Sequence, residues 1–214
     1  MKETEKHLQD IAQIRSMMER SSRFLSLSGL SGVFAGIYAL IGATAAYKLL
    51  GIHIREALSQ PSLFIANIGG SEDFNIPFLL IPICVLIAAL ISGYYFTHRN
   101  AKKNNQQIWT KTSWLMLANL FIPLAAGGLF CLILIFHGIY FLLASATLIF
   151  YGIALINASK YTLDEIRYLG ISEIVIGLLA GFFVGYGLLF WAIGFGVLHI
   201  VYGAVMWWRY ERNK

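Results

Sequence analysis

Glu173 is the only acidic residue in the long apolar stretches of this chain, which are predicted below to cross a membrane. A charge at the centre of a bilayer costs about 2.5–3.5 kcal/mol even on lenient scales, so a compensating partner is expected. Counted along ideal helices from the predicted membrane boundary, Glu173, Asn119 and Tyr202 fall at one depth, and His199 lies one turn deeper. These four residues predict an intramembrane polar cluster.

Two interpretations of this cluster stay open. In the first, Asn119, Glu173, Tyr202 and His199 line a pocket or a path for protons or ions. In the second, the cluster is structural, and a protonated Glu173 is hydrogen-bonded to Tyr202 or to a backbone carbonyl. The residue types fit both interpretations.

No metal or cofactor is predicted. A haem bound by His199 would need a second histidine at a similar depth, but His137 and His98 fall at the two membrane edges and His53 falls outside. The two cysteines are most simply small apolar filler residues, since two sulfurs and one edge histidine at no fixed spacing make a poor soft-metal site. They are Cys84 and Cys131.

Catalysis is not expected. The sequence contains no Walker A motif, G-x-S-x-G elbow, H-E-x-x-H or C-x-x-C motif. An intramembrane hydrolase normally needs several acidic, histidine or serine groups at one depth, and only one carboxylate is present there. We therefore expect a protein that is not an enzyme.

The composition is that of an integral membrane protein. Of the 214 residues, 58% are apolar and 13% charged, with a mean hydropathy of +0.68. Soluble domains have about 25% charged residues. The apolar residues form blocks long enough to span a bilayer. The predicted fold is all-α, with six transmembrane helices at 24–50, 77–97, 113–136, 139–158, 169–187 and 189–208.

The basic residues predict the orientation and explain the net charge of +5 without a nucleic-acid partner. Fourteen of the sixteen Lys and Arg residues fall in segments on one side, and only Lys48 and Arg55 fall on the other. Positive residues accumulate on the cytoplasmic side, so both termini are predicted to be cytoplasmic in a cell (inner or plasma) membrane.

Three segments flank or interrupt the 24–208 transmembrane domain. Residues 1–23 predict a cytoplasmic amphipathic helix. It lies on the membrane interface or against the bundle, or it forms a dimerisation seam or a docking helix for a partner. Residues 51–76 form a long outer loop, and 209–214 a basic cytoplasmic tail. Glycines four residues apart predict close helix packing, on one helix face at Gly32 and Gly36 and on another at Gly177, Gly181 and Gly185.

The six stretches are predicted to form three repeated αα-hairpins. The fifth stretch aligns with the third without a gap, pairing Ser172-Glu173 with Ala118-Asn119 and Ala180-Gly181 with Ala126-Gly127. The first stretch follows the same scheme with one deletion. Short connections at 137–138 and 186–189 predict two tight antiparallel hairpins.

Three such hairpins, each with an aromatic or basic start and a small-residue face, resemble the small six-helix bacterial acid-resistance membrane protein family. The resemblance covers residues 24–208 and implies a stress-related membrane protein. The residues themselves favour a non-enzymatic structural or stress-response protein that interacts with lipid, with itself as an oligomer, or with a membrane partner. The alternative is a small transporter or channel whose path passes Asn119, Glu173, Tyr202 and His199.

Overall fold

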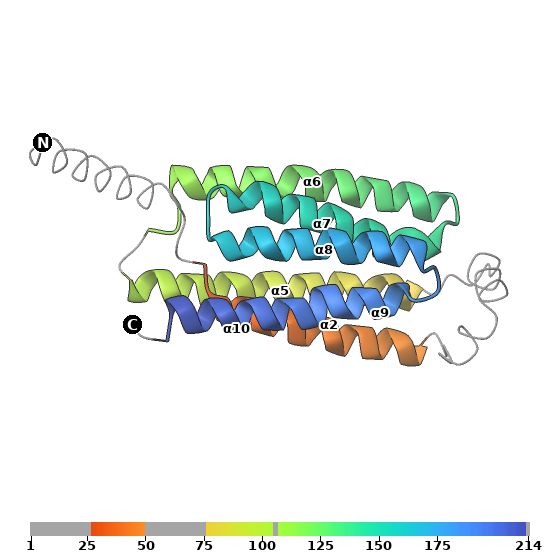
Figure 1. Cartoon of the computed structure of the whole chain (residues 1–214), viewed down its shortest axis with the longest axis horizontal. Coiled ribbons are helices and arrows are strands. Elements are labelled where there is room, and N and C mark those ends of the chain that lie inside the picture. Colours follow the sequence, from red (N-terminus) through yellow and green to blue (C-terminus); the bar gives the residue numbers. More distant parts are fainter. Residues whose placement is uncertain (1–26, 50–75, 105–106, 213–214) are drawn as a thin grey trace, which may run out of the picture.

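The computed structural model describes residues 27–49, 76–104 and 107–212. In this part of the chain the structure is all-α, as predicted, and its long helices lie side by side (Figure 1). The first five helices are α2 (Gly29–Leu49), α5 (Ile76–Lys103), α6 (Lys111–Phe136), α7 (Leu143–Ser159) and α8 (Asp164–Phe182), and a 3-10 turn at Tyr140–Leu142 precedes α7. Three consecutive segments then form one continuous helix, which we call the last helix. They are α9 (Gly187–Trp191), the π-helical segment η2 (Ala192–Leu198) and α10 (His199–Tyr210).

Five of the six long helices are apolar and long enough to cross a membrane, which indicates a multi-pass membrane protein. The exception is α8, whose 19 residues include Asp164, Glu165, Arg167 and Glu173. The spans predicted at 77–97 and 169–187 differ from the helices found. α5 continues to Lys103, and α8 begins and ends five residues earlier than predicted.

The helices form two groups of three (Figure 1). In one group α7 packs against α6 and α8, and in the other α2 packs against α5 and the last helix. The final hairpin is therefore divided, since α8 packs mainly on α7 and α10 mainly on α2. This differs from the tight hairpin predicted for these two helices. The threefold repeat stays a prediction.

Glycines let the helices approach closely within each group. A Cβ built on Gly32 would lie 3.2 Å from the Gly203 Cα, and one on Gly36 would lie 2.5 Å from the Gly196 oxygen. On α8, a Cβ at Gly177 would lie 2.8 Å from Ile149 Cγ1, and one at Gly181 would lie 3.0 Å from Ser145 Oγ. These four predicted packing glycines lie at helix contacts.

Gly185 does not lie on the helix face predicted for it. It lies beyond the last residue of α8, in the turn to α9, where its φ of +105° favours glycine. The regular four-residue spacing suggested a helix face, but the helix ends at Phe182.

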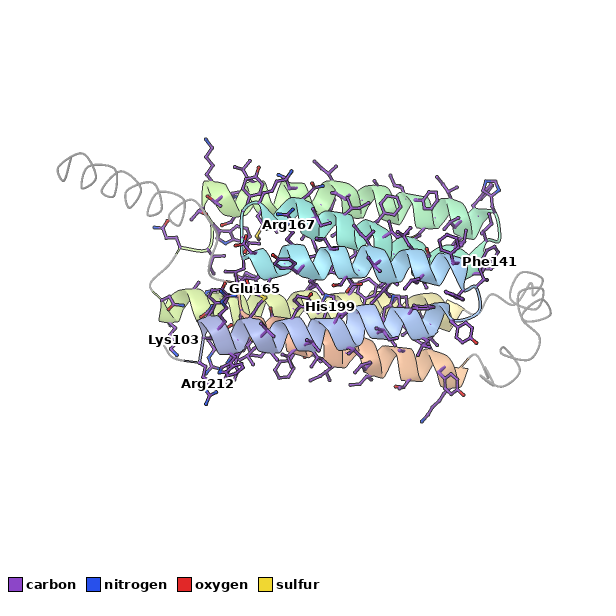
Figure 2. The ribbon with its side chains drawn as sticks, in the orientation of Figure 1. Lys103, Phe141, Glu165, Arg167, His199 and Arg212 are labelled. Carbon is purple, nitrogen blue, oxygen red and sulfur yellow. The ribbon has the colours of Figure 1, made fainter. Side chains whose placement is uncertain are left out.

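One end of the bundle collects basic side chains. Lys103, Arg167 and Arg212 lie at this end with Glu165, whereas Phe141 lies at the opposite end and His199 lies between (Figure 2).

Glu211 joins the end of the last helix to the start of α2, because its carboxylate accepts hydrogen bonds from the Gly29 N–H at 2.5 Å and the Ser28 hydroxyl at 3.1 Å. α10 includes Arg209, whereas the sequence predicts this residue in the tail. The helix predicted at 1–23 and most of the loop predicted at 51–76 lie outside the described residues.

Candidate functional site

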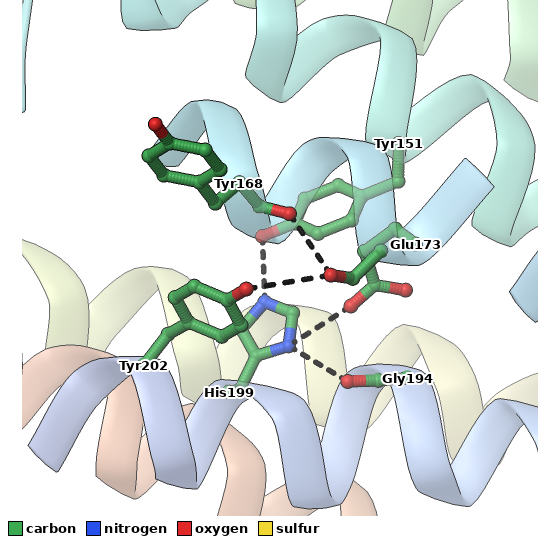
Figure 3. Close-up of polar contacts among 7 residues, drawn as sticks. Tyr151, Tyr168, Glu173, Gly194, His199 and Tyr202 are labelled. Atoms are coloured by element: carbon green, nitrogen blue, oxygen red, sulfur yellow. Dashed lines mark hydrogen bonds and ion pairs between the residues drawn. The ribbon is translucent and has the colours of Figure 1, made fainter. Parts of the chain in front are cut away.

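Glu173 lies in the middle of α8 and is completely buried, with 0% of its surface exposed. Neither carboxylate oxygen has a hydrogen-bond partner among the described residues. The side chain points across the boundary between the two groups of helices toward the last helix (Figure 3). Buried polar atoms in folded proteins are nearly always hydrogen-bonded, so this carboxyl is an exception that needs a reason.

His199, at the start of α10, faces Glu173 from the other group. Its Nδ1 lies 3.4 Å from Glu173 Oε1 and 3.1 Å from the Gly194 carbonyl oxygen, and its Nε2 lies 2.8 Å from the Tyr151 hydroxyl of α7 (Figure 3). A carbonyl can only accept, so Nδ1 carries the proton that it shares with Gly194. Nδ1 is directed at this carbonyl, which explains why the contact with Glu173 is not aligned as a hydrogen bond. We call Glu173, His199, Tyr151 and the Gly194 carbonyl the Glu173 centre.

The Glu173 centre can hold a proton in two places without losing its hydrogen bonds. With neutral His199, the Tyr151 hydroxyl donates to Nε2, and Glu173 carries the proton as a carboxylic acid. With protonated His199, Nε2–H donates to the same hydroxyl, and the Glu173 carboxylate lies 3.4 Å from the imidazolium. A hydroxyl both donates and accepts, so Tyr151 serves either state.

The π-helical segment η2 positions the Glu173 centre. Its Gly194 backbone lies directly against the carboxyl group, because a Cβ there would be 2.5 Å from Glu173 Oε2 and 2.5 Å from Leu148 Cδ2. The wider π turn shifts every later residue around the helix axis and so sets the direction of His199. π turns within helices are frequent at functional sites.

Tyr202 lies one turn beyond His199 on α10 and contacts α8. Its hydroxyl is 3.4 Å from Ser172 Oγ, which donates to the Tyr168 carbonyl at 3.0 Å (Figure 3). Tyr202 was predicted beside Glu173 itself, and the structure places it beside the preceding residue. Ser172 and Tyr202 are both half-buried.

Asn119 is the predicted member that the structure does not bring to this cluster. It lies on α6, where its amide donates to the Leu115 carbonyl of the same helix at 2.8 Å. Tyr151, Gly194 and Ser172 are the members that the sequence analysis missed. The only sequence signal for Tyr151 is its place before a glycine in the fourth apolar stretch. That pattern does not indicate a contact with Glu173 or His199.

In the described ranges no three His, Cys, Asp or Glu residues come together in a way that could hold a metal ion. Cys84 is exposed on α5 and Cys131 half-buried on α6, and neither forms a disulfide. The Glu173 centre therefore offers one carboxyl, one imidazole and one phenol, which are groups that bind and transfer protons.

No protein-family model, curated protein or solved structure matches this chain.

Proposed function

We propose that this chain is a non-enzymatic transporter that binds a proton at the Glu173 centre and moves its two groups of helices relative to each other as the proton is taken up and released. The observation that carries the proposal is the completely buried Glu173 carboxyl, which has no hydrogen-bond partner in the described chain and faces His199 across the boundary between the groups.

A purely structural cluster would be expected to satisfy its carboxyl group. An unsatisfied buried polar group costs about 1–3 kcal/mol, more if charged, and an apolar residue would avoid that cost. A proton-binding group has a different requirement, since it must exist in two states with little rearrangement between them. The Tyr151 hydroxyl meets this requirement because it hydrogen-bonds both forms of His199.

The proposed setting is a cell membrane with both chain ends in the cytoplasm. The basic side chains at the Arg212 end of the bundle support this orientation, because such residues are retained on the cytoplasmic side. Lipid is the proposed partner of the exposed apolar side chains. We propose no nucleic-acid partner.

Glu173→Gln tests the proposal, because glutamine has the same shape but cannot exchange a proton. In proteoliposomes with an imposed pH gradient, we expect the wild-type protein to conduct protons and Glu173→Gln to fall to the level of protein-free liposomes. Asn119→Ala should retain wild-type flux, since Asn119 bonds only within its own helix among the described contacts. Wild-type flux in Glu173→Gln would overturn the proposal.

The second candidate function is a structural or stress-response module that acts through partners, lipid or its own oligomer. The close glycine contacts between α2 and α10 and between α7 and α8 favour it, because they suit a rigid bundle. This candidate predicts no proton flux from the wild-type protein and a Glu173→Leu variant at least as stable as wild type. The flux experiment therefore separates the two candidates.

A further inference from the structure

Polar groups lie between the Glu173 centre and the basic end of the bundle. On α8, Glu165 and Ser172 are seven residues apart and therefore share one helix face. The buried Glu165 carboxylate accepts hydrogen bonds from Arg209 Nη1 at 3.0 Å and from the Tyr210 hydroxyl at 3.0 Å. About 12 Å of helix separates Glu165 from Glu173, at a rise of 1.5 Å per residue.

The Ser172–Tyr202 hydroxyl pair lies within that distance. Ser172 precedes Glu173 in the sequence of α8, and Tyr202 follows His199 by one turn on α10, so the pair lies on the Arg209 side of the Glu173 centre. Each hydroxyl can give up its own proton while accepting another, and is then unchanged. The pair is half-buried, in contrast to the fully buried Glu173.

Aromatic rings line the other side of the Glu173 centre. Trp191 and Phe195 have ring centroids 5.1 Å apart, Phe195 lies 5.1 Å from Tyr151, and Tyr151 lies 5.4 Å from His199. These rings form a continuous column along the last helix and α7.

The Ser145 hydroxyl on this side is buried in a contact between two helices. Ser145 of α7 donates to the Gly177 carbonyl at 2.7 Å, and this bond joins α7 to α8. Gly177 packs tightly there, because a Cβ on it would lie 3.0 Å from Leu148 Cβ. The surroundings of the Glu173 centre are therefore asymmetric, with hydroxyl groups toward Arg209 and tightly packed rings and backbone on the other side.

We infer that the Glu173 centre exchanges its proton with water at the Arg209 end of the bundle, through the Ser172–Tyr202 hydroxyl pair, while the aromatic column closes the opposite side. This inference rests on the proposed function and adds a direction to it. A hydronium ion in that water gives its proton to the hydroxyl pair and becomes water. The pair passes one of its own protons to the Glu173 carboxylate, which becomes a carboxylic acid, and both hydroxyls are restored.

Two nearly isosteric substitutions test the direction. Ser172→Cys and Ser145→Cys are made separately in a Cys84→Ser, Cys131→Ser background and treated with a charged, membrane-impermeant methanethiosulfonate. The reagent reacts with a thiolate, which forms only where water reaches the side chain. We expect Ser172→Cys to react at least ~10-fold faster than Ser145→Cys, because exposure controls thiol reactivity. Reaction should occur only from the membrane side at which a Lys103→Cys reference reacts.

A second pair on the last helix repeats the test, so that one poorly folded variant does not decide it. Tyr202→Cys should react from the Lys103→Cys side, and Phe195→Cys should not. Equal or faster labelling of Ser145→Cys and Phe195→Cys, or labelling of Ser172→Cys from the opposite side, would overturn the inference. Neither labelling result depends on proton flux. If labelling contradicts the inferred route but Glu173→Gln still abolishes flux, the proposed function stands and only the route is wrong.

Discussion

At the scale of single residues, the Glu173 centre joins three side chains from three helices, one each from α7, α8 and α10. The pairing depends on the tautomer of His199, which the Gly194 carbonyl fixes by accepting from Nδ1. Nε2 of the neutral imidazole is then an acceptor, and the Tyr151 hydroxyl donates to it. Removing that hydroxyl should therefore disturb His199 more than it disturbs the fold.

We expect Tyr151→Phe to lower the free energy of unfolding by about 1 kcal/mol, the usual net worth of one hydrogen bond. The imidazole nitrogen resonances of His199 should shift at the same time, because Nε2 loses its donor. Detergent unfolding and nitrogen NMR of labelled histidine measure the two effects. Tyr168→Phe is the matched control, since the Tyr168 ring is 60% exposed. An unchanged His199 spectrum in Tyr151→Phe would contradict the assignment.

At the scale of helices, glycine decides where two backbones can touch. The contact of α7 with α8 is reciprocal, because a Cβ on Gly170 would lie 2.7 Å from the Gly152 oxygen and a Cβ on Gly152 would lie 2.6 Å from the Gly170 oxygen. Other helical glycines have open space around them. A Cβ on Gly93 of α5 or Gly128 of α6 would meet nothing within 4 Å among the described residues.

This contrast gives a matched pair of substitutions. Gly170→Ala should lower the free energy of unfolding by about 1–3 kcal/mol, the usual cost of overpacking, because the new methyl group would be pressed against the Gly152 backbone. Gly93→Ala should be neutral or stabilising by up to about 1 kcal/mol, since alanine favours the helix. Thermal unfolding in one detergent compares them. An equal effect of the two substitutions would show that the α7–α8 contact is looser than described.

At the scale of the whole molecule, the two groups of helices meet where α7 and α8 pack against the last helix, and α5 and α6 expose long apolar surfaces. The exposed side chains on these two helices include Leu86, Leu90, Ile122 and Leu129. In water such surfaces would aggregate, but lipid tails are as apolar as leucine and solvate them. The basic residues then sort to one end, because translocating them across the membrane is unfavourable.

The orientation can be tested with single cysteines at the two ends, again in the Cys84→Ser, Cys131→Ser background. Lys48 lies in the last turn of α2 and Lys103 in the last turn of α5. We expect an impermeant thiol reagent to label Lys48→Cys from outside intact cells and Lys103→Cys only after the membrane is opened. The reverse pattern would place both chain ends outside the cytoplasm.

The sequence alone predicted the all-α class and the six long helices of the described residues, and it singled out Glu173 and His199, which lie 3.4 Å apart. Hydropathy is a local property, so apolar stretches and a lone acid within them stand out without knowledge of contacts. The histidine at a similar depth, His199, follows from the helical rise alone. The depth of a residue along its helix does not show which face of the helix Asn119 or Tyr202 occupies. The prediction from depth therefore placed Asn119 in the cluster wrongly.

Only the tertiary structure decided which faces meet. Helices that are apolar on all sides carry no periodic signal to show which face packs inward. The π turn at Ala192–Leu198 changes the rotation of the last helix, and the helix end at Phe182 moves Gly185 into a turn. The contact of Tyr151 with His199, and hence the centre itself, depends on the packing of α7, α8 and the last helix, which no single stretch of sequence contains.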